Sequence, residues 1–143
     1  MGVRADDCSI AATLAFVGDR WSLLILRDAF RGVRRFADLR DDLGIARNIL
    51  ADRLDKLVEA GILERVLYQE RPRRHEYRLT AKGRDLSPAL IALMRWGDRW
   101  ANDGDAPTHL VHDACGTELE QLLRCPSCDV EVTPTHIRSR QSA

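Results

Sequence analysis

FADLRDDLGIARNILADRLDKLVEAG, residues 36–61, is the stretch that decides the fold. Residues 36–43 place Phe and Leu side chains on one face of a two-turn helix, and Gly44 follows as a turn residue. A longer helix is predicted over about residues 46–60, with leucines at helical spacing and Gly61 as its C-cap. A short helix, a glycine turn and a longer helix form the helix-turn-helix pattern.

Two helices are predicted before this stretch. Residues 8–18 carry one apolar stripe at helical spacing, and Asp19 is a suitable cap for a second helix over residues 20–30. The second helix is apolar around most of its circumference, so we expect it at the centre of the core.

A β-hairpin is predicted after the helix-turn-helix. Residues 64–69 and 76–79 have the composition and alternation of two strands. The link between them, residues 70–75, is polar, basic and interrupted by proline, as expected for a hairpin turn. A hairpin with a basic tip in this position is the wing of a winged helix.

A long C-terminal helix is predicted over about residues 81–102, with Thr80 as its cap and Pro88 marking either a later start or a kink. Its apolar side chains are too many for one small domain to cover, so together with the first helix they predict a dimer interface. The predicted interface residues are Ile10, Leu14, Leu90, Leu93, Trp96 and Trp100. The alternative is that the tryptophans fold onto their own domain.

The predicted fold class is therefore α+β, mainly α: a winged helix-turn-helix with a long C-terminal dimerisation helix. We expect a DNA-binding and dimerisation domain over residues 8–103, a small zinc-ribbon-like extension over residues 108–133, and a flexible tail over residues 134–143. No internal repeat is apparent.

Composition and charge narrow the class of protein. The chain has 143 residues, of which 45% are hydrophobic and 31% charged, as in an ordinary globular protein. No apolar run reaches the roughly 20 residues of a membrane span, and the N-terminus lacks a secretion signal, so a cytoplasmic, nucleoid-associated location is expected. The net charge is zero, but residues 31–84 hold 14 Lys/Arg against 9 Asp/Glu. Residues 98–143 hold 4 against 8, so a basic face and an acidic appendage are predicted.

Three basic clusters lie where a winged helix touches DNA. The second helix of the motif begins with Arg47 and Asn48, residue types that pair with guanine and adenine in the major groove. An arginine in the first turn of a helix opposes the helix dipole unless a phosphate is near. The other predicted contacts are to the DNA backbone, and they come from Arg34, Arg35, Arg40, Arg71, Arg73 and Arg74. Plain solvation of these charges is the alternative.

The cysteine-bearing segment has the ligand types of a structural zinc site. His112 and Cys115 form one pair, and Cys125 and Cys128 form a Cys-x2-Cys pair, which together give a Cys₃His set. His109 competes with His112 as the fourth ligand. The alternatives are a hairpin without metal and a Cys125–Cys128 disulfide.

Cys8 stands apart from the other three cysteines, at the start of the first predicted helix. A helix N-terminus favours the thiolate, so one hypothesis is a sensor of oxidants or electrophiles. The alternative is a small buried hydrophobic residue.

Several separated motifs resemble the HxlR family of bacterial winged-helix regulators, relatives of the MarR-type regulators. They run in order through residues 8–103: Cys8-Ser9-Ile10, GDRWSLLILR (18–27), RFADL (35–39), ADRL (51–54), AGIL (60–63) and EYRLTAKG (76–83). The resemblance implies a dimer formed through the first and last helices that binds operator DNA. It also implies that a cysteine like Cys8 can sense quinones, aldehydes or disulfide stress, although Ser9 stands where the family usually has proline. Ala46 stands where the family often has a capping Ser or Thr.

The predicted function is a homodimeric, sequence-specific transcriptional regulator that binds a palindromic operator in double-stranded DNA, most simply as a repressor, with an oxidant or small molecule as effector. The alternative is a winged-helix module that binds protein, with a structural zinc adaptor. Catalysis is not expected, because the sequence has no Ser/His/Asp or Cys/His arrangement and no phosphate-binding loop.

Overall fold

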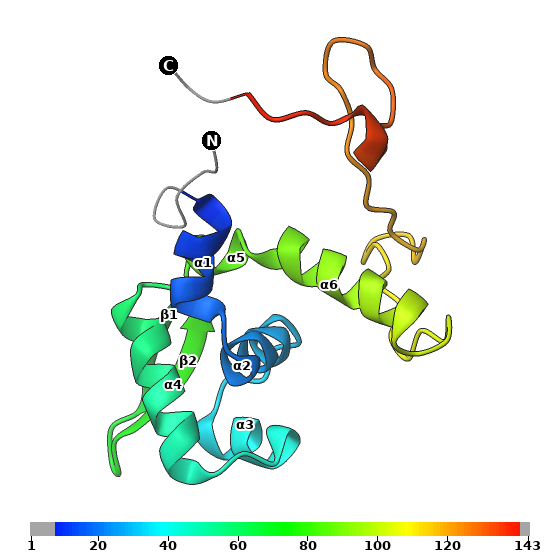
Figure 1. Cartoon of the computed structure of the whole chain (residues 1–143). Coiled ribbons are helices and arrows are strands. Elements are labelled where there is room, and N and C mark those ends of the chain that lie inside the picture. Colours follow the sequence, from blue (N-terminus) through cyan, green and yellow to red (C-terminus); the bar gives the residue numbers. More distant parts are fainter. Residues whose placement is uncertain (1–7, 141–143) are drawn as a thin grey trace. The chain divides into compact units, whose positions relative to one another are not determined.

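The computed structural model describes residues 8–140, which fall into two compact units. The first unit ends at Leu90 and the second begins at Ile91. The elements, in chain order, are α1 (Ser9–Val17), α2 (Arg20–Phe30), α3 (Phe36–Leu43), α4 (Arg47–Glu59), β1 (Leu63–Gln69), β2 (Arg74–Leu79), α5 (Ala81–Arg84), α6 (Ser87–Trp100) and the 3₁₀ turn η2 (Pro134–His136) (Figure 1).

The helix-turn-helix prediction is confirmed by α3 and α4. Gly44 joins them with a φ of 60°, a left-handed conformation that glycine adopts without a Cβ clash. One side of α4 is completely buried through Leu50, Leu54 and Leu57, which fixes the rotation of the helix about its axis. The core continues into α2, where Ile25 and Leu26 are fully buried, as predicted for a central helix.

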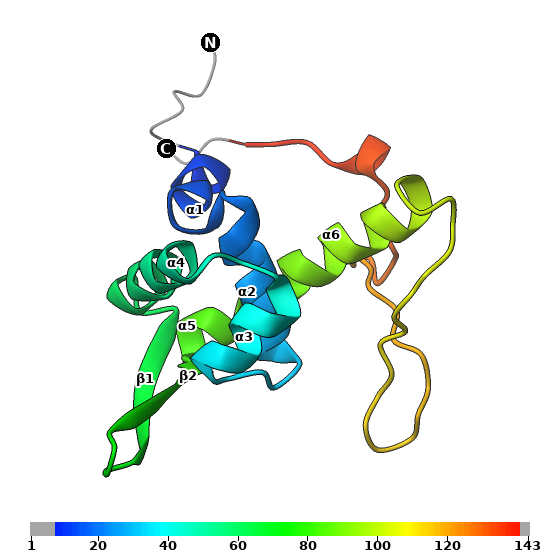
Figure 2. The ribbon, with the colours of Figure 1, turned by 90° about the horizontal axis from the view of Figure 1, so that it is seen from below.

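The wing prediction is confirmed by the antiparallel pair β1 and β2, which runs from Leu63 opposite Leu79 to Gln69 opposite Arg74. The segment before α3 lies along the outer edge of β2. There Arg35 forms an isolated bridge with Glu76, and the Tyr77 N–H donates to the Arg34 carbonyl at 2.7 Å. Figure 2 shows the hairpin projecting beyond the helices of the first unit.

The predicted caps are present, but the predicted helix over residues 81–102 is divided. The Thr80 hydroxyl accepts a hydrogen bond from the Gly83 N–H at 3.1 Å, which caps α5, and α5 ends after four residues. A new helix, α6, begins at Ser87. Pro88 is then in the first turn of α6, where its missing N–H and fixed φ cost nothing.

The second unit consists of the rest of α6 and a mostly irregular segment over residues 101–140. In that segment the structure has two isolated β-bridges, Val111 with Glu118 and Arg124 with Glu131. The predicted flexible tail starts with η2, and residues 141–143 of that prediction lie outside the described residues. No single helix between residues 8 and 140 is long and apolar enough to span a membrane, whereas α1 and α2 together meet that test across an 80° bend.

Candidate nucleic-acid interface

The start of α4 presents two of the predicted base-contacting residues to solvent. Arg47 and Asn48 are exposed in the first turn of α4, ahead of Leu50, the first of its buried leucines. Ala46, the N-cap residue, provides no side-chain hydrogen bond, and the first turn of α4 holds no acidic residue. The N–H groups and positive end of the helix dipole therefore face solvent uncompensated, which favours an anion. The Arg47 guanidinium lies over the Phe36 ring, 5.5 Å from its centre.

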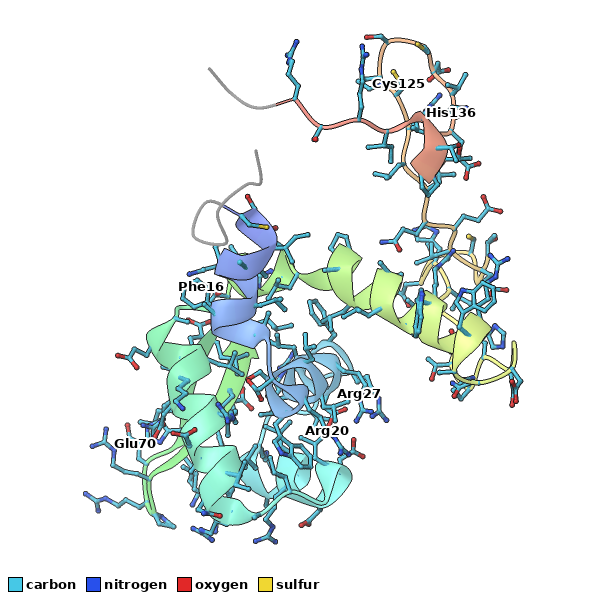
Figure 3. The ribbon with its side chains drawn as sticks, viewed as in Figure 1. Phe16, Arg20, Arg27, Glu70, Cys125 and His136 are labelled. Carbon is cyan, nitrogen blue, oxygen red and sulfur yellow. The ribbon has the colours of Figure 1, made fainter. Side chains whose placement is uncertain are left out.

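The hairpin turn carries the second cluster. Arg71, Arg73 and Arg74 are exposed, and none of them forms an ion pair with any residue between 8 and 140. Figure 3 shows nitrogen-bearing side chains around the labelled Glu70 at this tip. Three cations held close together without partners repel one another, and a polyanion would remove that cost.

The third cluster is only partly available. Arg34 and Arg35 are exposed beside β2, and the Arg35 guanidinium stacks over the Tyr68 ring at 4.6 Å. Arg40, by contrast, is paired with Asp41 at 3.1 Å. Tyr68 was missed by the sequence analysis, because its role depends on the loop before α3 packing beside the hairpin.

The first two clusters lie at the same end of the first unit. In Figure 1 the N-terminal end of α4 and the tip of the β1–β2 hairpin are both at the lower edge of the unit. Helix α4 and strand β1 separate these two clusters in the sequence, so it is the fold that brings them to the same end of the unit. A surface of this kind can place a helix in a groove while the hairpin contacts the flanking backbone.

Two aspartates that the sequence analysis did not single out, one of them buried, hold this scaffold in place. Asp28 is completely buried in α2, where it accepts hydrogen bonds from Arg27 at 2.8 Å and Arg31 at 3.2 Å. Burial raises the pKa of Asp28 despite these cations. Asp42 of α3 pairs with the same Arg31 at 3.0 Å, so the guanidinium ties α2 to α3.

Asp19 caps α2 as predicted, since its carboxylate accepts a hydrogen bond from the Ser22 N–H at 2.9 Å. Burial opposes ionisation of this carboxyl. The hydrogen bonds from Ser22 and the charge of Arg53, 3.4 Å away, outweigh burial and lower the pKa of Asp19.

Most of the predicted interface residues are exposed in the single chain. On α1, Ile10 is 71% exposed and Leu14 53%. On α6, Trp96 is 65% exposed and Trp100 64%, and Leu93 is also exposed. Leu90 differs, because it is half-buried against the core of the first unit. The alternative in which both tryptophans fold onto their own domain is therefore not seen.

The predicted zinc ligands lie in two separate pairs. His112 Nδ1 is 3.2 Å from Cys115 Sγ, and the Cys125 thiol hydrogen bonds with Cys128. Between residues 8 and 140 no three ligating side chains come together around one point. The competing His109 is engaged elsewhere, with its Nδ1 3.2 Å from a carboxylate oxygen of Glu118.

Cys8 is the N-cap residue of α1 and is half-buried, and its side chain makes no capping hydrogen bond. Both hypotheses for this thiol, sensor and buried hydrophobic residue, stay predictions.

Known proteins resemble the chain in sequence and in structure. The profile of the HxlR-like helix-turn-helix family matches residues 16–105. The uncharacterised HTH-type transcriptional regulator Rv3095 of Mycobacterium tuberculosis is 47% identical over 135 residues, which cover 94% of this chain and 85% of that protein. The crystal structure of PA1607, described as a candidate transcription factor, superposes with a TM-score of 0.84 at 38% identity and covers 94% of this chain and 95% of its own. The redox regulator HypR in its oxidised form superposes with a TM-score of 0.60 at 30% identity, over 64% of this chain and 96% of its own.

Proposed function

Because the chain belongs to the HxlR-like helix-turn-helix family of transcriptional regulators, we propose that it binds a palindromic operator as a homodimer and represses the adjacent promoter. The observation that carries this proposal is a set of exposed arginines that form no ion pair with residues 8–140 and lie at two places on one end of the first unit, the start of α4 and the tip of the hairpin. Occupation of a promoter by such a dimer excludes polymerase from the same duplex, which is why repression is the simplest mode.

In this mechanism the two clusters have different tasks. Arg47 and Asn48 enter the major groove on the first turn of α4, where the guanidinium forms two hydrogen bonds with a guanine and the amide two with an adenine. The hairpin arginines contact phosphates, which fixes the register of the protein on the duplex and carries no sequence information. The exposed N-terminus of α4 adds a further attraction for a phosphate.

The dimer is supported by the apolar side chains that α1 and α6 leave in contact with water. The two tryptophans of α6 are nearly two-thirds exposed, and no residue of α6 is buried. In a monomer this helix would therefore leave an apolar patch in contact with water. A second copy related by two-fold symmetry would cover such a surface and would double the DNA contacts at half-sites one helical turn apart.

A binding titration with the full chain tests the proposal. Genomic fragments from the source organism compete with random duplex at physiological salt, and a specific site is expected to bind at least about 10³-fold more tightly. Equal affinity for all fragments would refute sequence-specific regulation. The rival function, a protein-binding winged helix, predicts association with a protein partner that is insensitive to salt and independent of DNA.

A further inference from the structure

Residues 110–132 form two turns with the same backbone hydrogen bonds, thirteen residues apart, although no repeat is apparent in the sequence. In the first turn His112 N–H donates to the Thr117 carbonyl at 2.8 Å, and in the second Cys125 N–H donates to the Val130 carbonyl at 2.9 Å. Two further bonds of the first turn have counterparts in the second. The Gly116 N–H donates to the His112 carbonyl, as the Asp129 N–H does to that of Cys125. The Leu119 N–H donates to the Leu110 carbonyl, as the Val132 N–H does to that of Leu123. The isolated bridges Val111–Glu118 and Arg124–Glu131 match in the same way.

The repeat places one candidate ligand pair at equivalent positions in each turn. His112 in the first turn corresponds to Cys125 in the second, and Cys115 corresponds to Cys128. The residue after each second ligand has a positive φ, which closes the turn: 69° at Gly116 and 61° at the equivalent aspartate. Two unrelated loops would not be expected to share all of these features.

Hydrogen bonds within each turn fix the positions of the candidate ligands. Cys125 accepts backbone hydrogen bonds from Ser127 and Cys128, and Cys115 accepts one from Thr117. His112 is already turned toward Cys115, whereas His109 is turned toward Glu118.

The described part of the second unit, residues 91–140, also lacks a buried apolar core. All of the buried hydrophobic residues that the structure describes lie at or before Leu63. Apolar side chains of the two turns remain half-exposed or more, among them Val111, Leu123 and Val130. Segments of this size that bury no apolar core are usually stabilised by a metal or by disulfides.

We propose that the two turns are the halves of one structural zinc site, with His112, Cys115, Cys125 and Cys128 as its four ligands. One imidazole and three thiolates suit tetrahedral Zn²⁺ and leave no open position for catalysis. The ion draws the two turns together, and the apolar side chains around them become buried in the same step. Each thiol that binds releases its proton to solvent.

The test uses the full chain, loaded with zinc chloride and then dialysed. Elemental analysis should give one zinc per chain. A thiol reagent should modify one cysteine, Cys8, in the loaded protein and all four after a strong chelator removes the metal. Substoichiometric zinc with four reactive thiols would overturn the proposal. So would a Cys125–Cys128 disulfide in protein prepared under reductant-free conditions, or one zinc shared by two chains.

Matched variants distinguish ligands from bystanders. Cys115→Ser, Cys125→Ser and His112→Asn should each lose stoichiometric zinc, while His109→Asn should keep it. Zinc retained by the Cys115→Ser variant, or lost from His109→Asn, contradicts the assigned ligand set. Because the first unit has its own buried core, its thermal unfolding in the cysteine variants should match that of the parent and so rule out misfolding as the cause.

Discussion

The substitution Arg73→Ala tests whether the hairpin contacts phosphates. Arg73 is exposed at the tip and has no ion-pair partner among residues 8–140, so its removal leaves the fold intact. Each phosphate contact contributes about 0.9 to the slope of log K against log salt concentration, and a two-fold dimer places Arg73 on the duplex twice, so the slope should fall by about 1.8.

That change is large enough to measure without knowledge of the operator. Between about 50 and 200 mM salt the logarithm of the salt concentration rises by about 0.6, so a slope lower by about 1.8 changes log K by about 1. The factor by which affinity falls over this range should therefore be about ten times smaller for the variant than for the parent. Fluorescence anisotropy with a labelled random duplex measures both slopes, because the electrostatic contribution does not depend on sequence.

Arg40→Ala is the matched control, since it removes the same charge from a side chain already paired with Asp41. Its salt slope should change much less than that of Arg73→Ala. An unchanged slope for Arg73→Ala, or equal changes in the two variants, would refute the assignment of the hairpin to the DNA backbone.

Four further substitutions test other parts of the molecule. Arg47→Lys keeps the charge but loses the two-bond geometry, so it should reduce discrimination between operator and random duplex by about 1–3 kcal/mol while affinity for random duplex is retained, as competition titrations would show. Trp96→Glu should weaken the dimer by at least about 2 kcal/mol, and sedimentation velocity that still finds a parent-like dimer contradicts the predicted interface. Asp19→Asn should be less stable than the parent above about pH 4, because the ionised carboxylate is the stabilising form. The difference in the free energy of unfolding should shrink as pH falls through the lowered pKa of Asp19, and denaturant unfolding at several pH values measures it. Gly83→Ala should destabilise the first unit by about 1–3 kcal/mol, since a Cβ there would lie 2.2 Å from the Ile62 carbonyl oxygen; an unchanged melting temperature would show that this contact relaxes freely.

The sequence by itself determined the elements that depend on local spacing. Residues 36–61 contain the leucines, the turn glycine and the C-cap glycine of the helix-turn-helix, and the hairpin follows from alternation on either side of a proline-containing link. The same spacing predicted that the second helix begins near Arg47 and Asn48, because the leucines that follow them recur with a helical period. Asp19 and Thr80 were recognisable as caps for the same local reason.

Only the tertiary structure decided which charges are free and which are used inside the protein. Asp28 and Arg40 have the same residue types as the surface charges around them. Asp28 is buried because α2 packs against α1, α3, α4 and β2, and Arg40 is paired with its neighbour Asp41. The two cysteine-bearing turns share few side chains, and their likeness lies in backbone hydrogen bonds, which residue identities do not encode directly. The start of α4 and the hairpin tip lie at one end of the unit because the core packs the intervening segments, and that packing depends on contacts between residues far apart in the chain.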